Sequence, residues 1–354
     1  MTGSSDHQKE FTVSVETLVS HGQALEQYLR DRGDYESLLQ TFGEEVKKLA
    51  AFNPRQRVPV DTIARNIDTL AQWINEPYLG LKLAPYSVRR QQRLALFFTE
   101  RELPLLDYLR LLARYACISS EVMRMELETT QQHIILRVTP NSPQGISRHQ
   151  IEGFVASIHA IVNQARGLLP RCIDFSHPLP DPAGVPQLYT EVLGVTPGFG
   201  QSHNRLVYPN QQRDQYTLPQ RPGTAGFAHL QAMEAVKRKE IGAENWASRC
   251  RFLLEILLYY GEPNKSLLAE LLAVTPRTLQ RHLEAEGTGF RPLLADLRQQ
   301  LALDYLAREQ FNNEDIAFLL GYQDVGRFFK AFKSWYGITP GQYRASHPPC
   351  PPTG

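Results

Sequence analysis

Two short stretches in the last third of the chain carry side chains that suit nucleic acid. They fall into two groups, which are Arg277, Gln280 and Arg281, followed by Arg327, Lys330 and Lys333. Arginine offers paired N–H groups to guanine, glutamine offers a donor and an acceptor to adenine, and lysine attracts phosphate oxygens. We therefore treat these side chains as candidate DNA contacts.

The spacing of apolar residues indicates which way these side chains point. Leu279 and Leu283 lie four residues apart in the first stretch, and Phe328 and Phe332 do the same in the second. Residues at this spacing share one helix face, so each pair predicts a buried face and leaves the polar side chains exposed. A single surface charge is usually only a solvated group. Here, however, cationic side chains lie on the exposed face of the helix in both stretches, and this coincidence favours a binding surface.

An internal repeat precedes the two stretches. Residues 268–275 and 316–323 share the order apolar, Ala, two variable positions, Leu, small, apolar, polar. A short helix with Ala on its packing face and a small residue in the following turn is typical of a helix-turn-helix unit. Thr275 is expected to cap the next helix with Pro276 in its first turn, and Asp324 is expected to cap the second. Thr275 also joins the candidate DNA contacts.

A leucine-rich stretch, 292–308, separates the two copies. It predicts a helix whose inward face consists of Leu293, Leu294, Leu297, Leu301 and Tyr305. A helix of this length holds two units in a fixed relation. We expect the units to lie about one DNA turn apart, roughly 34 Å, and to meet two successive major-groove segments.

The segment 11–210 predicts an α+β regulatory domain. Alternating residues at 125–128 and 133–138 predict a β-hairpin, and periodic apolar residues predict helices at 103–115 and 151–165. The fold class that follows is an α+β N-terminal regulatory domain joined to an all-α C-terminal domain of two helix-turn-helix units linked by a long helix.

Composition places the remaining boundaries. The segment 211–226 is rich in proline and glycine and predicts a linker, so that 227–346 forms the DNA-binding domain. The ends, 1–10 and 347–354, have little apolar material to bury, and we expect both to be disordered.

Charge and cysteine usage exclude several classes of protein. Lys and Arg number 38 and Asp and Glu number 37, so any DNA surface depends on local placement rather than on overall basicity. The four cysteines form no CxxC pair, which argues against a zinc site or a disulfide framework. No apolar run reaches the roughly 18 residues that a membrane span needs. We expect a cytoplasmic, nucleoid-associated protein with no cofactor, no metal and no membrane partner.

The C-terminal third resembles the AraC/XylS family of bacterial transcription regulators, whose DNA-binding domain has two helix-turn-helix units joined by a long helix. The most specific part is residues 313–324, NEDIAFLLGYQD, and residues 275–281, TPRTLQR, are similar to the family's first recognition helix. This resemblance implies that Arg277, Gln280 and Arg281 face bases. The second unit departs from the family pattern at Val325, Gly326, Arg327 and Phe329, so its contacts are either to bases or mainly to phosphates.

The N-terminal part resembles the arabinose-binding-like regulatory domain of one branch of this family. The resemblance lies in residues 174–178, DFSHP, in 189–204, and in 80–83, GLKL. Ligands in that branch vary, so the name of the domain does not identify arabinose as the effector.

We hypothesise a regulator of transcription that binds double-stranded promoter or operator DNA. Its N-terminal domain senses a small-molecule effector or forms a homodimer, and RNA polymerase is an expected partner. Activation and repression remain open, and so does a role as an interaction protein that acts through the N-terminal domain.

An enzyme is the rival hypothesis. It relies on His177 with Asp174, or on His203 with His149, as catalytic or metal-binding groups. The sequence has no HExxH, GxSxG, P-loop or dinucleotide-binding motif to support it.

Overall fold

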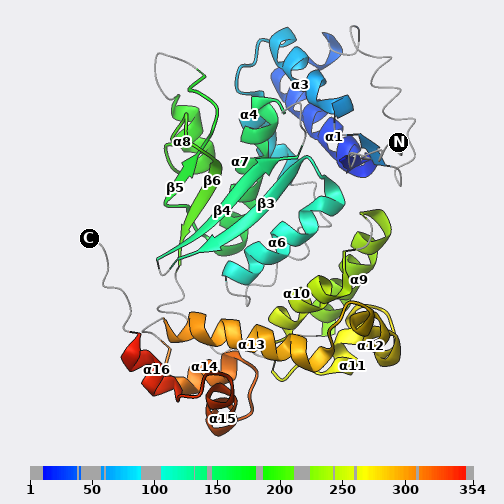
Figure 1. Ribbon diagram of the computed structural model, residues 1–354. Helices are drawn as coiled ribbons and strands as arrows, with labels where there is room; N and C mark the ends of the chain where they lie inside the picture. Colours follow the sequence, from blue (N-terminus) through cyan, green and yellow to red (C-terminus); the bar gives the residue numbers. More distant parts are fainter. Residues whose placement is uncertain are drawn as a thin grey trace, which may run out of the picture. The chain divides into compact units, whose positions relative to one another are not determined.

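A computed structural model describes most of the chain (Figure 1). The described residues are 11–37, 40, 57–59, 61–88, 105–130, 132–141, 146–180, 186–210, 224–241, 244–258, 261–307 and 311–347. The chain divides into two compact units, Met1–Asn210 and Gln211–Gly354. The predicted disordered N-terminus, residues 211–223 of the predicted linker and residues 348–354 of the predicted tail lie outside the described residues.

A four-stranded antiparallel sheet forms the centre of the N-terminal unit. Its order is β3 (Met123–Thr129), β4 (His133–Pro140), β6 (Asn204–Pro209) and β5 (Cys172–Asp174). Strands β3 and β4 are the predicted hairpin, with Leu127 opposite Leu136. Alternate residues of β4 are buried, as expected for a sheet with one face packed on a core.

Helices cover this sheet and extend the unit. They are α1 (Val15–Arg32), α3 (Asp61–Trp73), α4 (Leu79–Val88), α6 (Leu105–Ser119), α7 (Arg148–Arg166) and α8 (Gln187–Leu193). A small sheet of β1 (Thr12–Ser14) and β2 (Arg57–Pro59) adjoins α1. The predicted helices at 103–115 and 151–165 are confirmed as α6 and α7, with shifted ends.

Helices α4 and α7 cross at very short range. A Cβ atom on Gly80 would overlap the carbonyl oxygen of His149, and one on Gly153 would lie 3.0 Å from the carbonyl oxygen of Gly80. The crossing therefore requires glycine at position 80, where the two backbones touch.

The C-terminal unit consists of helices. In order they are α9 (Thr224–Glu240), α10 (Trp246–Leu258), α11 (Lys265–Leu271), α12 (Pro276–Ala285), α13 (Phe290–Leu306), α14 (Asn313–Leu319), α15 (Val325–Tyr336) and α16 (Pro340–Ser346). Helix α13 is the predicted connecting helix, and Figure 1 shows α12 and α15 near its opposite ends. The predicted fold class is thus confirmed.

Two further observations complete the description. His347, which the sequence assigned to the tail, stacks on Tyr343 with ring centroids 4.2 Å apart and ends the described chain. Within the described ranges, no helix combines the length and the apolar character needed to cross a membrane.

Candidate nucleic-acid interface

The first helix-turn-helix unit consists of α11 and α12. Asn264 caps α11 by accepting a hydrogen bond from the backbone N–H of Leu267 at 2.8 Å. The turn passes through Ala273, which has a positive φ of 52°. Thr275 then caps α12, because its hydroxyl accepts from the N–H of Thr278 at 3.1 Å, and Pro276 occupies the first turn. The predicted capping role of Thr275 is confirmed.

The candidate contacts of α12 lie opposite its buried face. Leu279 and Leu283 are fully buried, whereas Arg277 and Arg281 are exposed. Four residues separate the two arginines, so they share one side of the helix. Gln280 is half-buried, and its amide donates to the Glu284 carboxylate at 2.8 Å. The structure thus presents two exposed guanidinium groups, with an amide beside them that already has a partner.

Contacts with α10 fix the end of α12. The Glu286 carboxylate accepts hydrogen bonds from the backbone N–H groups of Trp246 and Ala247, at 2.7 and 2.8 Å. The Trp246 indole stacks on His282 with centroids 4.1 Å apart. A carboxylate at a helix N-terminus satisfies orphan N–H groups and is attracted by the helix dipole. The sequence analysis did not identify this structural role of Glu286.

The second unit consists of α14 and α15. Asn312 and Asp315 form a capping box at the start of α14, and Asp324 caps α15 by accepting from the N–H of Arg327 at 2.9 Å. The turn passes through Gly321 at φ 68°. Asp324 therefore performs the predicted capping role.

The candidate contacts of α15 are all exposed. Phe328 and Phe332 are fully buried, and Arg327, Lys330 and Lys333 lie on the remaining surface. Residues three apart on an α-helix point about 60° away from each other around its axis. Lys330 is one such step from Arg327 and Lys333 is two, so Lys333 lies at the edge of this surface. The Arg327 guanidinium is 3.3 Å from the Asp324 carboxylate, with both side chains more than half exposed. Such an exposed pair is weak and leaves Arg327 available.

The departures from the family pattern have different structural outcomes. Phe329 is half-buried and meets Phe328 edge to face at 6.0 Å, so it contributes to packing. Gly326 is exposed, and a Cβ there would lie 3.1 Å from the carboxylate of Asp324. The space near the cap thus limits the side chain at position 326.

A buried arginine that the sequence analysis missed joins α13 to the second turn. Arg298 donates to the carbonyl oxygens of Leu320 at 2.8 Å and Gly321 at 3.2 Å, and it lies 4.3 Å from the ring centroid of Tyr322. Burial lowers the pKa of Arg298 below its ordinary value, while the neighbouring Tyr322 acts in the opposite direction. The available signal was a single arginine within the leucine-rich inward face of this helix.

Three of the four residues of the rival enzyme hypothesis contact neighbouring side chains, and the fourth, His149, is buried. Asp174 accepts a hydrogen bond from Arg205 at 2.6 Å, and His203 contacts the hydroxyl of Ser202. His177 stacks on Phe175, with Nε2 3.5 Å from the buried Glu152. Burial lowers the pKa of His177 and raises that of Glu152. His149 is buried, and its pKa is lowered to about 4 mainly by burial.

These residues form no metal centre. Over the described ranges, no group of three or more His, Cys, Asp or Glu side chains is arranged to hold a metal ion. The buried polar groups around Glu152 instead tie α7 to the segment after β5 and to α8, because Glu152 also accepts from Tyr189 and Arg148.

Two capped helix-turn-helix units with exposed cationic second helices define a DNA-binding class of protein. Comparison with known proteins agrees with that class. Residues 33–215, more than half of the chain, match the arabinose-binding domain of AraC transcription regulators, and residues 268–346 match a helix-turn-helix domain. The chain therefore belongs to the AraC family of transcription regulators.

Individual relatives extend this comparison. The ornithine utilization regulator of Pseudomonas aeruginosa is 30% identical over 235 residues, which cover 65% of this chain and 68% of that protein. The regulator VirS of Mycobacterium tuberculosis is 24% identical over 79% of this chain and 82% of its own length. The crystal structure of the regulator CdpR from Pseudomonas aeruginosa aligns over 91% of this chain and 97% of its own, with 20% identity and a TM-score of 0.44.

The family assignment decides between the hypotheses. The chain is a DNA-binding transcription regulator with an N-terminal domain of the effector-binding type, and it is not an enzyme. Both resemblances drawn from the sequence are confirmed.

Proposed function

We propose that α12 and α15 are the recognition helices and that they enter two successive major-groove segments of promoter or operator DNA. The observation that carries the proposal is the exposed cationic face on the second helix of both units, opposite a fully buried apolar pair. The packing of a helix-turn-helix core does not require cationic side chains at these positions. Hydrogen bonds to base edges and attraction to phosphates would explain them.

The candidate contacts divide by their geometry. Arg277 and Arg281 are exposed on one side of α12 and suit bidentate pairing with guanine, with Gln280 beside them for adenine. Thr275 stands at the N-terminus of the same helix, where backbone N–H groups attract phosphate. Arg277, Gln280 and Arg281 are thus the proposed base contacts of the first unit, and Thr275 is its proposed phosphate contact.

The second unit is proposed to combine base and phosphate contacts. Arg327 and Lys330 lie in the first half of α15, which is the half that approaches base edges in this motif. Lys333 lies in its last turn and at the edge of the exposed surface, which suits a phosphate.

Regulation is assigned to the N-terminal unit, which has its own sheet and core. We infer that a small-molecule effector or formation of a homodimer changes how the C-terminal unit engages DNA, and that RNA polymerase is the partner through which transcription is activated or repressed. A DNA partner of this kind places the protein in the cytoplasm, at the nucleoid.

Affinity measurements on selected operator DNA test the DNA contacts. Arg281→Ala is expected to cost about 1–3 kcal/mol on the operator and much less on unrelated DNA, because a bidentate base contact is lost. Lys333→Ala is expected to weaken both DNAs similarly and to reduce the slope of log K against log salt by about 1.

Arg238 supplies the matched control, because it is exposed on α9 and lies on neither recognition helix. Arg238→Ala is expected to bind as the unmodified chain does. If Arg281→Ala and Lys333→Ala also bind the operator with unchanged affinity, the proposed contacts are wrong.

A further inference from the structure

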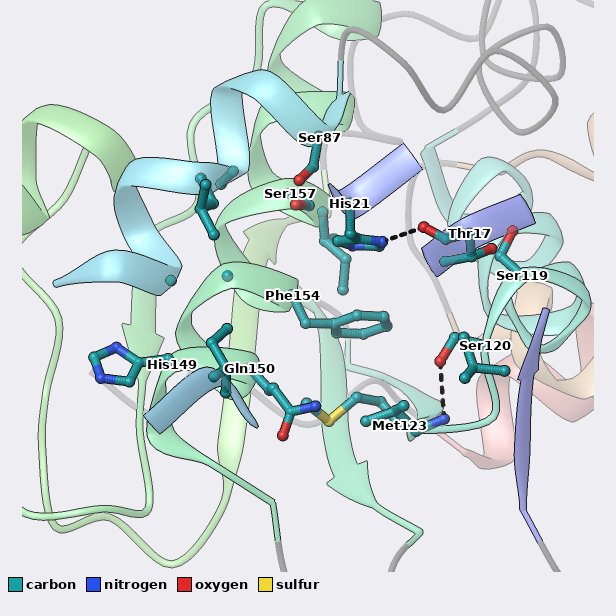
Figure 2. Close-up of a pocket in the computed structure, with 18 of the residues that line it drawn as sticks. Thr17, His21, Ser87, Ser119, Ser120, Met123, His149, Gln150, Phe154 and Ser157 are labelled. Atoms are coloured by element: carbon teal, nitrogen blue, oxygen red, sulfur yellow. Dashed lines mark hydrogen bonds between the residues drawn. The ribbon is translucent and has the colours of Figure 1, made fainter. Parts of the chain in front are cut away.

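The N-terminal unit contains a partly open cavity of about 340 Å³ (Figure 2). Its wall combines residues of α1, α4, α6, β3 and α7, which are far apart in the sequence. Ligand pockets in proteins have volumes of roughly 300–1,000 Å³, so this cavity suits a small molecule. Phe154 of α7, which helical periodicity would assign to a closed core, lies only half-buried at this wall.

The wall is mainly aliphatic. Side chains of this kind include Leu25, Leu83, Leu112, Met125 and Ile161. None of the described residues that line the cavity is Asp, Glu, Lys or Arg. A charged ligand would lose hydration here without gaining a counter-ion from these described residues, which is unfavourable. The chemistry of the wall therefore selects an uncharged and largely hydrocarbon molecule.

His21 of α1 gives the cavity one well-defined hydrogen-bonding group. Its Nδ1 lies 2.7 Å from the carbonyl oxygen of Thr17 and must carry the proton, because a carbonyl oxygen only accepts. Burial among the surrounding protein atoms lowers the pKa of His21, so the ring is neutral at pH 7. A neutral ring protonated at Nδ1 leaves an unprotonated Nε2, which accepts but does not donate.

His21 is one of the side chains that line the cavity. The side chain is exposed, although burial among protein atoms dominates its pKa. Ser87 and Ser157 line the same cavity, as Figure 2 shows. Among the residues that the structure describes, Nε2 has no hydrogen-bond partner.

Two other polar side chains of the wall, Ser120 and Gln150, already take part in hydrogen bonds. The Ser120 hydroxyl accepts from the backbone N–H of Val122 at 3.2 Å, and Oε1 of Gln150 accepts from the N–H of Ser147 at 3.1 Å. These bonds reduce the competition for the polar end of a ligand, and the hydrogen bond from Nδ1 of His21 to Thr17 defines Nε2 of His21 as an acceptor.

We propose that this cavity binds an uncharged, mainly apolar small molecule that carries one hydroxyl, and that the hydroxyl donates to Nε2 of His21. The proposal rests on the proposed function, since it names the chemical class of effector that the N-terminal unit senses.

Four probes of similar length separate the features of the ligand. We would measure binding of octan-1-ol, octanoate, octylamine and 1-methoxyheptane to the full chain by calorimetry and by the shift in Tm. Octan-1-ol is expected to raise the Tm by about 5 °C at about 100 times its Kd. Octanoate and octylamine are expected to bind at least tenfold more weakly because they are charged, and 1-methoxyheptane about tenfold more weakly because it lacks the donor.

Two variants locate the site. His21→Phe keeps a ring but removes the acceptor, and it is expected to lower octan-1-ol affinity about tenfold while binding 1-methoxyheptane as before. Ser157→Leu places a larger side chain in the cavity and is expected to abolish binding of both probes. His203→Phe is the matched control, because His203 is exposed and lies outside the cavity wall, and it is expected to leave binding unchanged.

The outcomes separate this proposal from the proposed function. Equal affinity for the alcohol and both ions, or unchanged octan-1-ol binding in His21→Phe and Ser157→Leu, would overturn the assignment of the cavity. Operator binding of the same preparations is measured in parallel without any probe. If the unmodified chain binds the operator but not octan-1-ol, the cavity proposal alone is contradicted. If the unmodified chain binds octan-1-ol but not the operator, only the proposed DNA contacts are contradicted.

Discussion

The two helix-turn-helix units repeat one sequence pattern but hold their turns by different means. In the first unit the turn residue is Ala273, which is exposed and has a left-handed backbone conformation. In the second it is Gly321, which is buried with a similar φ. A Cβ on Gly321 would lie 2.5 Å from the carbonyl oxygen of Gly261, whereas the turn at Ala273 already accommodates one. The first turn therefore tolerates backbone strain, and the second requires the absence of a side chain.

The supports of the two units also differ. Glu286 and the Trp246–His282 stack connect the first recognition helix to α10. Arg298 connects the second turn to α13 through two carbonyl oxygens. The comparison shows that a repeated pattern of apolar and small residues fixes the local shape, while each copy is anchored by its own long-range polar contacts.

The largest expected effect comes from adding one methyl group to the second turn. Gly321→Ala combines a left-handed conformation, which costs roughly 1–2 kcal/mol, with a backbone clash of a kind that costs typically 1–3 kcal/mol. We expect the free energy of unfolding to fall by about 3 kcal/mol, measured by urea denaturation of the full chain with Trp246 and Trp335 as fluorescent probes. A loss below about 1 kcal/mol would show that the turn relaxes easily.

Removal of the buried guanidinium is expected to have the next largest effect. Arg298→Met leaves the carbonyl oxygens of Leu320 and Gly321 without donors and is expected to destabilise the unit by about 2 kcal/mol. Arg298→Lys should recover only part of this loss, because an ammonium group does not reproduce the planar fork. Hydrogen exchange at residues 320–322 is the measurement. Unchanged exchange in Arg298→Met would contradict the anchoring role.

The first unit is expected to lose less when its own anchor is removed. Glu286→Ala frees two N–H groups at the start of α10 and is expected to cost about 1 kcal/mol. Because that helix end is solvent-accessible, water replaces part of the lost bonding. Thermal unfolding of Glu286→Ala beside Glu284→Ala, a nearby exposed carboxylate on α12, gives the comparison. Equal Tm values for the two variants would contradict a capping role.

The smallest expected effect has the opposite sign. Ala273→Gly relieves a left-handed conformation worth roughly 1–2 kcal/mol and adds backbone entropy to the unfolded chain worth about 0.4–1 kcal/mol. We expect a net stabilisation of about 0.5–1 kcal/mol, seen as a higher midpoint in the same urea experiment. Destabilisation by Ala273→Gly would mean that the two turns differ less than their structures indicate.

These comparisons explain what could be predicted from the sequence. The caps at Thr275 and Asp324 and the buried pairs of both recognition helices depend on residues within one or two turns, so local patterns were sufficient. Arg298 could not be assigned in this way, because its acceptors lie more than twenty residues away and a charged side chain ordinarily favours the surface. Its burial becomes visible only once α13 and the second turn are in place.

The N-terminal unit shows the same limit at a larger scale. Its hairpin and α7 were predictable from periodicity, but Phe154 has the spacing of a core residue and lies instead at a cavity. The cavity depends on elements from α1 to α7, which no local pattern relates. The sequence therefore supports a regulatory domain of this family, whereas the cavity within it became visible only in the fold.

The glycine crossing of α4 and α7 has a mechanical consequence. Both helices line the cavity, and at Gly80 no side chain separates their backbones. Because a Cβ at Gly80 would overlap the backbone of α7, no larger group can move into this contact, and sliding of one helix along the other is therefore resisted. A guest molecule that widens the space between these helices is therefore expected to rotate one helix relative to the other about the contact at Gly80.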